Sequence, residues 1–153
     1  MVSKQEKLEA FAELVAFAEE LEHLPEEQWS GSIAEGKWSP RDIISHMMLW
    51  DNYFLEHAVR PMAAHQPLTL KNLDFDEFNR DAAVYGLTQS KADLIRQTVE
   101  TRLELLNVLQ GIPEAEFGIK HGGVMSVDEY LIDFYEHDRH HMGQIRAYIE
   151  GQA

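Results

Sequence analysis

The sequence predicts an all-α protein, most simply a four-helix bundle with a short accessory helix. Four segments begin with a serine that is followed three residues later by an acidic residue, the pattern of a capping box at a helix N-terminus. Long segments with helical hydrophobic periodicity follow these pairs, and strand signals are almost absent. The four pairs are Ser3 with Glu6, Ser39 with Asp42, Ser90 with Asp93, and Ser126 with Glu129.

The first two long helices are each bounded by a proline. We expect the first helix to run from about Lys4 to Leu24, because Pro25 cannot continue it. The second begins at Pro40, a residue suited to the first helical position. It is expected to end near Arg60, before the Arg60-Pro61 break.

The second half of the chain contains the accessory helix and two more long helices. The accessory helix is expected over Asp74 to Tyr85, with Gly86 closing it. The third long helix spans about Lys91 to Gln110, and the fourth runs from Val127 to Glu150. The long stretch between the second and fourth helices permits a crossover connection, so simple up-and-down order is not assumed.

Length and composition predict one soluble domain over residues 1–153, with 44% hydrophobic and 26% charged residues. The chain has no cysteine, which excludes disulfides and thiolate metal sites. We find no signal peptide pattern and no apolar stretch long enough for a membrane span, so a cytoplasmic protein without a membrane partner is expected. Thirteen basic and 27 acidic residues give a net charge of −14, which argues against nucleic acid as a partner.

The last predicted helix carries the most informative pattern, two histidines four residues apart. His137 and His141 lie at the edge of the apolar face of this helix. A spacing of four places both imidazoles on one side, one turn apart, where they can bind the same metal ion. The spacing alone is a weak signal, but a buried imidazole needs a partner, either a metal or a hydrogen-bonded carboxylate.

A third candidate ligand lies on the second helix. His46 follows Asp42 by one turn and precedes Trp50 by one turn, beside an apolar stripe. Three neutral imidazoles suit Zn²⁺ or Ni²⁺, and also Fe²⁺, better than Mg²⁺ or Ca²⁺, and they leave positions open for water and substrate. By itself His46 would more often be a hydrogen-bonded core residue, and only the other two histidines make it a candidate ligand.

Other polar residues flank the candidate ligands. His140 lies on the polar side of the helix and is expected at the pocket rim or surface. Asp138 is the candidate to accept the second ring N–H of a ligand histidine, although it could pair with an arginine instead. Asp133 is expected on a solvated acidic face. Four aromatic residues are candidates for a pocket lining, namely Trp50, Tyr53, His121 and Tyr148.

Two motifs resemble those of the DinB-like (DinB/YfiT) metal-dependent bundle proteins. One is the run from Trp38 to Asp42 that leads into His46, and the other is the sequence HDRHHMGQI, which contains His137 and His141. The resemblance covers about residues 4–150. It implies that His46, His137 and His141 bind a divalent metal and that the protein is a homodimer.

The resemblance also implies a range of functions. Characterised members of the family include thiol-dependent transferases and isomerases that use low-molecular-weight thiols, and some hydrolases. The leading hypothesis is therefore an enzyme that acts on a small molecule at a three-histidine metal site. The region from Trp38 to Trp50 also resembles the ClbS/DfsB branch, in which the ligands are not always kept. A metal-free small-molecule binding or resistance protein is the alternative, and a purely structural module is a third possibility.

Overall fold

The computed structural model describes residues 2–151, and nearly all of this part of the chain is helical or connects helices. Within it there is no strand, only one isolated bridge between His121 and Met125. The predicted all-α fold is confirmed. The elements in chain order are α1 (Lys4–Phe11), α2 (Glu13–Glu20), η1 (Leu21–His23), α3 (Glu26–Ser30), α4 (Pro40–Phe54), η2 (Leu55–Val59), α5 (Arg60–Ala63), α6 (Phe75–Leu87), α7 (Lys91–Gln110), η3 (Glu114–Glu116) and α8 (Val127–Gly151).

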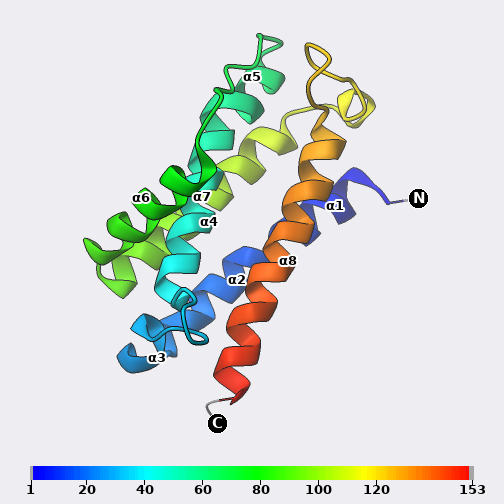
Figure 1. Ribbon diagram of the computed structural model, residues 1–153. Coiled ribbons are helices and arrows are strands. Elements are labelled where there is room, and N and C mark those ends of the chain that lie inside the picture. The colour runs from blue at the N-terminus through cyan, green and yellow to red at the C-terminus, as the bar shows by residue number, and fades with distance from the viewer. Residues whose placement is uncertain (1, 152–153) are drawn as a thin grey trace.

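Four long helical segments make up the bundle: α1 with α2, α4 with η2 and α5, α7, and α8 (Figure 1). Helices α4 and α7 pack side by side and run in the same direction, which requires a long connection between them (Figure 1). That connection carries α6, which packs along α4. The crossover that the sequence permitted is therefore present, and α6 is the accessory helix.

The four predicted helix starts are confirmed. Ser3, Ser39 and Ser126 each accept a hydrogen bond from the acidic residue's backbone N–H, and that residue's carboxylate accepts from the serine's backbone N–H. Ser90 accepts from the Asp93 N–H, while the Asp93 carboxylate accepts from Arg96 instead. Capping depends only on neighbours in sequence, which explains why these starts were predictable.

The first predicted helix is interrupted at Ala12, between α1 and α2. In an unbroken helix the Phe11 carbonyl would accept from the Val15 N–H, but this N–H donates to the Ala12 carbonyl instead. The Phe11 carbonyl accepts from the guanidinium of Arg102 on α7, at 2.8 Å. A buried side chain from another helix thus replaces a helical hydrogen bond. This corrects the expectation of one continuous helix from Lys4 to Leu24.

The second helix does not end at Arg60, as the sequence predicted. It continues through a π-helical turn, η2, into α5 and ends at Ala63. Pro61 has no N–H, so the carbonyl four residues earlier, that of His57, loses its helical donor. The backbone N–H of Thr69 donates to this carbonyl at 2.9 Å. The π turn precedes the proline, and this outside donor satisfies the carbonyl that the proline leaves without a helical partner.

The core consists of two hydrophobic clusters, one toward each end of the bundle. Each of α4, α7 and α8 has one buried charged residue at the boundary between the two clusters. On each helix, residues to one side of it pack in one cluster and residues to the other side pack in the other. These residues are Asp51, Arg102 and Asp138, and they form an ion-paired group. This group, called the charged triad below, ties together the two helices that carry the candidate ligands. Among residues 2–151, no helix is long and apolar enough to cross a membrane.

Candidate metal centre

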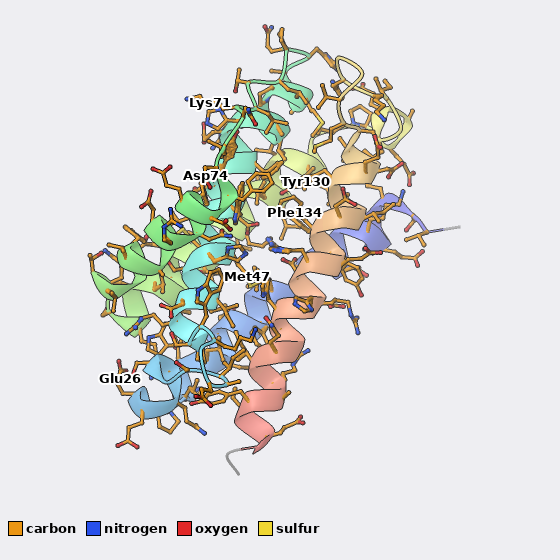
Figure 2. The ribbon with its side chains drawn as sticks, in the orientation of Figure 1. Glu26, Met47, Lys71, Asp74, Tyr130 and Phe134 are labelled. Atoms are coloured by element: carbon orange, nitrogen blue, oxygen red, sulfur yellow. The ribbon has the colours of Figure 1, made fainter. Side chains whose placement is uncertain are left out.

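The three candidate ligands come from the middle of α4 and the middle of α8. His46 lies on α4, and His137 and His141 lie one turn apart on α8. The two helices pack against each other (Figure 2), and Phe134 of α8 contacts Phe54 at the C-terminal end of α4. One ligand nitrogen from each histidine lies within 4.8 Å of the other two. The structure therefore brings together all three histidines that the sequence singled out.

The spacing of the Nε2 atoms matches that of ligands around one metal ion. His137 Nε2 lies 3.4 Å from His46 Nε2 and 3.1 Å from His141 Nε2. Two nitrogens that bind a tetrahedral zinc at 2.0–2.1 Å are roughly 3.3 Å apart. The imidazoles thus stand at nearly ligand spacing, with their Nε2 atoms facing one centre.

The outer nitrogens of two histidines are held by amide side chains. His46 Nδ1 bonds to Asn79 Oδ1 on α6 at 2.8 Å, and the indole N–H of Trp50 donates to the same oxygen at 2.9 Å. His141 Nδ1 bonds to Gln144 Oε1 at 2.8 Å. An amide oxygen only accepts, so each Nδ1 carries the proton and each Nε2 presents a lone pair. This is the usual arrangement of a metal-binding histidine.

Burial lowers the pKa of all three histidines, which favours their neutral form. Burial, followed by the neighbouring His141, lowers the pKa of His46 to about 4. Burial is also the main cause that lowers the pKa of His141 to about 4, and it lowers the pKa of His137. Without a metal, one proton can form a hydrogen bond between only one pair of Nε2 atoms, so at least one Nε2 lone pair has no partner. A divalent cation accepts all three lone pairs. The donor set therefore fits a divalent metal, and neutral imidazole is the form that binds it.

Asp138 does not bond to a histidine in this structure. Its two carboxylate oxygens accept from Arg102, at 2.6 and 3.2 Å, and the side chain is buried. This corrects the expectation that Asp138 orients a ligand ring, and it realises the arginine pairing that the sequence left open. His140 is exposed, as expected for a residue on the polar side of α8.

Sequence reasoning missed the residues that orient the rings. Gln144 lies three residues after His141, so its helical position offered a local signal. Asn79 had no such signal, because it lies on the accessory helix, 33 residues from His46. Only the packing of α6 on α4 brings Asn79 to the ligand.

A cavity of about 350 Å³ opens beside His46 and His137, between α4, α6 and α8. We call it the aromatic cavity, because four of its lining residues are aromatic. Of the four aromatic candidates from the sequence, Trp50 lines it and the other three do not. It is a volume suited to a small molecule. Its lining residues are His46, Trp50, Phe54, Phe75, Asn79, Asp133, Phe134 and His137.

Together, the fold and the site define a helical bundle whose neighbouring helices α4 and α8 present three convergent imidazoles to a small cavity. The chain belongs to the DinB superfamily, whose family model matches residues 9–145. A search of curated proteins finds no significant match.

Among solved structures, the chain resembles YfiT from Bacillus subtilis, described as a probable metal-dependent hydrolase with an unusual four-helix bundle topology. The TM-score is 0.74 at 14% identity, over 97% of this chain and 87% of the other. At this identity, the similarity establishes the shared fold.

Replacing the amides that hold the histidines should weaken metal binding. We expect Asn79→Leu and Gln144→Met each to lower zinc affinity by roughly 10–100-fold, the usual cost of losing a hydrogen bond to a ligand histidine. The affinity can be measured by competition with a chromophoric chelator. Gln110→Met, at an exposed position at the end of α7, is the matched control and should bind zinc like the wild type. Unchanged affinity in both amide variants would show that the rings need no such support.

Proposed function

We propose that the protein is a metal-dependent enzyme that holds a divalent ion, zinc first and nickel second, on His46, His137 and His141. The observation that carries the proposal is the spacing of the Nε2 atoms: that of His137 lies 3.1 Å from that of His141 and 3.4 Å from that of His46, and the three ligand nitrogens lie within 4.8 Å of one another. The orientation of His46 and His141 by amide oxygens supports it. The substrate is a small molecule bound in the aromatic cavity.

Hydrolysis is the reaction class that we propose first, because the structural relative YfiT is described as a probable metal-dependent hydrolase. When bound, the ion would act as a Lewis acid that polarises a substrate carbonyl or activates water or a thiol. Three protein ligands leave a coordination position free for this purpose, as in catalytic rather than structural zinc sites. The chain's own residues position the ion and line the cavity where an apolar substrate body binds.

A thiol-dependent transferase or isomerase reaction at the same site is the second form of the proposal. The chain contains no cysteine, so the thiol would be a low-molecular-weight cosubstrate. In this form the three histidines serve the same purpose, because a thiol binds to such a metal as the thiolate. The two forms differ in the cosubstrate that a turnover assay requires.

The test is a zinc titration of the full chain, purified without an affinity tag and freed of metal with a chelator. We expect one zinc ion per chain. We also expect thermal stability to rise with zinc concentration, because an ion that binds only the folded state stabilises it by about 2.7 kcal/mol at 100 times its dissociation constant. A chain that binds no zinc or nickel, and whose small-molecule binding is the same in chelator, would be the metal-free binding protein instead.

A further inference from the structure

The walls of the aromatic cavity determine which molecules it accepts. Trp50 stacks on Phe78 with ring centroids 4.0 Å apart, and Phe75 stands edge-on to Trp50 at 5.5 Å. Phe54 and Phe134 are in edge-to-face contact, with ring centroids 4.7 Å apart, and Phe54 also contacts Trp50 at 5.9 Å. These contacts fix rings from α4, α6 and α8 against one another, so the cavity is formed before a ligand binds. Phe75 is 65% exposed, which leaves a hydrophobic surface at the cavity's edge.

The only acidic or basic side chain among the cavity's lining residues, other than the two histidines, is that of Asp133. It is exposed and forms neither a hydrogen bond nor an ion pair with the described residues. No lysine or arginine lines this cavity. A separate cavity of about 260 Å³ at His141 contains Lys37 and has no acidic residue in its lining. The two spaces around the histidines therefore differ in charge.

The aromatic cavity has two different ends along α8, one at Asp133 and one at His137. Asp133 precedes His137 by one turn, and side chains with this spacing are neighbours on a helix surface, about 5–6 Å apart at Cβ. A metal ion at the histidines would add positive charge at one end, and the Asp133 carboxylate supplies negative charge at the other. A molecule about as long as one substituted ring would span both ends.

We propose that the aromatic cavity selects small organic cations: molecules with an apolar or ring-containing body and a basic or quaternary nitrogen that lies near Asp133. Aromatic faces attract such nitrogens through cation–π interaction, in addition to the pull of the carboxylate. In this arrangement the uncharged, reactive part of the molecule faces His46 and His137. The choice of reactive end rests on the proposed function, whereas the charge preference rests on Asp133 and the rings alone.

The experiment compares two probes on the full chain, once loaded with zinc and once treated with chelator. The cation is benzyltrimethylammonium, whose quaternary nitrogen cannot bind a metal, and the uncharged probe of similar size is benzyl methyl sulfone. Binding is followed by NMR at the indole N–H signal of Trp50, assigned with Trp50→Phe. The variants are Asp133→Asn and, as matched control, Glu136→Gln, which removes one charge from an exposed position on α8 outside the cavity lining.

We expect the wild type to bind the cation about tenfold more tightly than the sulfone, through the carboxylate and the rings together. Asp133→Asn should weaken cation binding about three- to fivefold, the effect of one exposed charge, and change sulfone binding less than twofold. Glu136→Gln should change both less than twofold. Equal binding of the two probes, or equal effects of the two variants, would overturn the proposal.

The two preparations separate this proposal from the proposed function. Asp133 is not a proposed ligand, so Asp133→Asn should bind zinc like the wild type, and the charge preference should persist in chelator. If the preference holds but no zinc binds, the metal-dependent function fails and the cation selectivity stands. If zinc binds but the preference is absent, the selectivity fails and the metal centre stands.

Discussion

Replacing Arg102 with leucine is expected to remove about 3–5 kcal/mol of folding free energy, the usual cost of leaving buried charges without their partner. All five N–H groups of the guanidinium are used. Nε and Nη2 donate to Asp51, Nη1 and Nη2 donate to Asp138, and Nη1 also donates to the Phe11 carbonyl. The Arg102 side chain is 1% exposed, so water cannot replace these partners. Because whole domains are stable by only about 5–15 kcal/mol, this loss should be visible in urea or thermal unfolding.

The pH dependence of the Arg102→Leu variant distinguishes a charge effect from simple loss of packing. Burial raises the pKa of Asp51 to about 6, although Arg102 lowers it. Without Arg102 this pKa should rise further, so the folded state binds a proton that the unfolded state does not. Stability then falls as pH rises through the folded pKa, and the loss relative to the wild type should be smaller near pH 5 than near pH 8.

Two further variants complete the Arg102 experiment. Arg96→Leu, on the same helix, removes an arginine that is 59% exposed and pairs only with surface acids, so it should cost less than about 1 kcal/mol. Adding Asp51→Asn to Arg102→Leu should recover part of the lost stability, because one buried carboxylate is removed. A loss in Arg102→Leu no larger than that in Arg96→Leu would mean that the charged triad does not hold the bundle together.

The charged triad also marks the limit of what the sequence could predict. Helix starts at Ser3, Ser39 and Ser126 depend on residues three positions away, and each was predicted. The break at Ala12 depends on a hydrogen bond between Phe11 and Arg102, which are 91 residues apart. The helical pattern around Phe11 is the same with or without that bond, so only the tertiary structure reveals the break.

The residues of the candidate site also differ in whether the local sequence could predict them. His137 and His141 share one helix face, so their spacing predicted that they would lie together. His46 comes from another helix, and its place beside them followed from the family resemblance. Asn79 depends on how α6 packs on α4, which no local pattern encodes. The three candidate ligands could therefore be predicted from the sequence. Of the two amides that hold their rings, Gln144 had a local sequence signal and Asn79 had none.

Truncating a histidine of the centre is expected to have the largest effect on metal binding. His137→Ala and His141→Ala should each lower zinc affinity by more than the 10–100-fold expected for the amides that orient the rings, because they remove a direct ligand. Isothermal titration of each variant measures the affinity. His137 Nε2 lies 3.4 Å from His46 Nε2 and 3.1 Å from His141 Nε2, so His137→Ala removes an atom that is close to both other ligands.

His140→Ala is the matched control, because His140 is adjacent to His141 in sequence but exposed and outside the convergent group. It should bind zinc with wild-type affinity and stoichiometry. As pH falls from about 6.5 to about 4, the apo form of His141→Ala should lose less stability than the apo wild type, because burial lowers the pKa of His141 to about 4 and the unfolded wild type binds a proton there that the folded state does not. If His140→Ala loses zinc while His141→Ala keeps it, the ion binds on the outer face of α8 and the three-histidine centre is wrong.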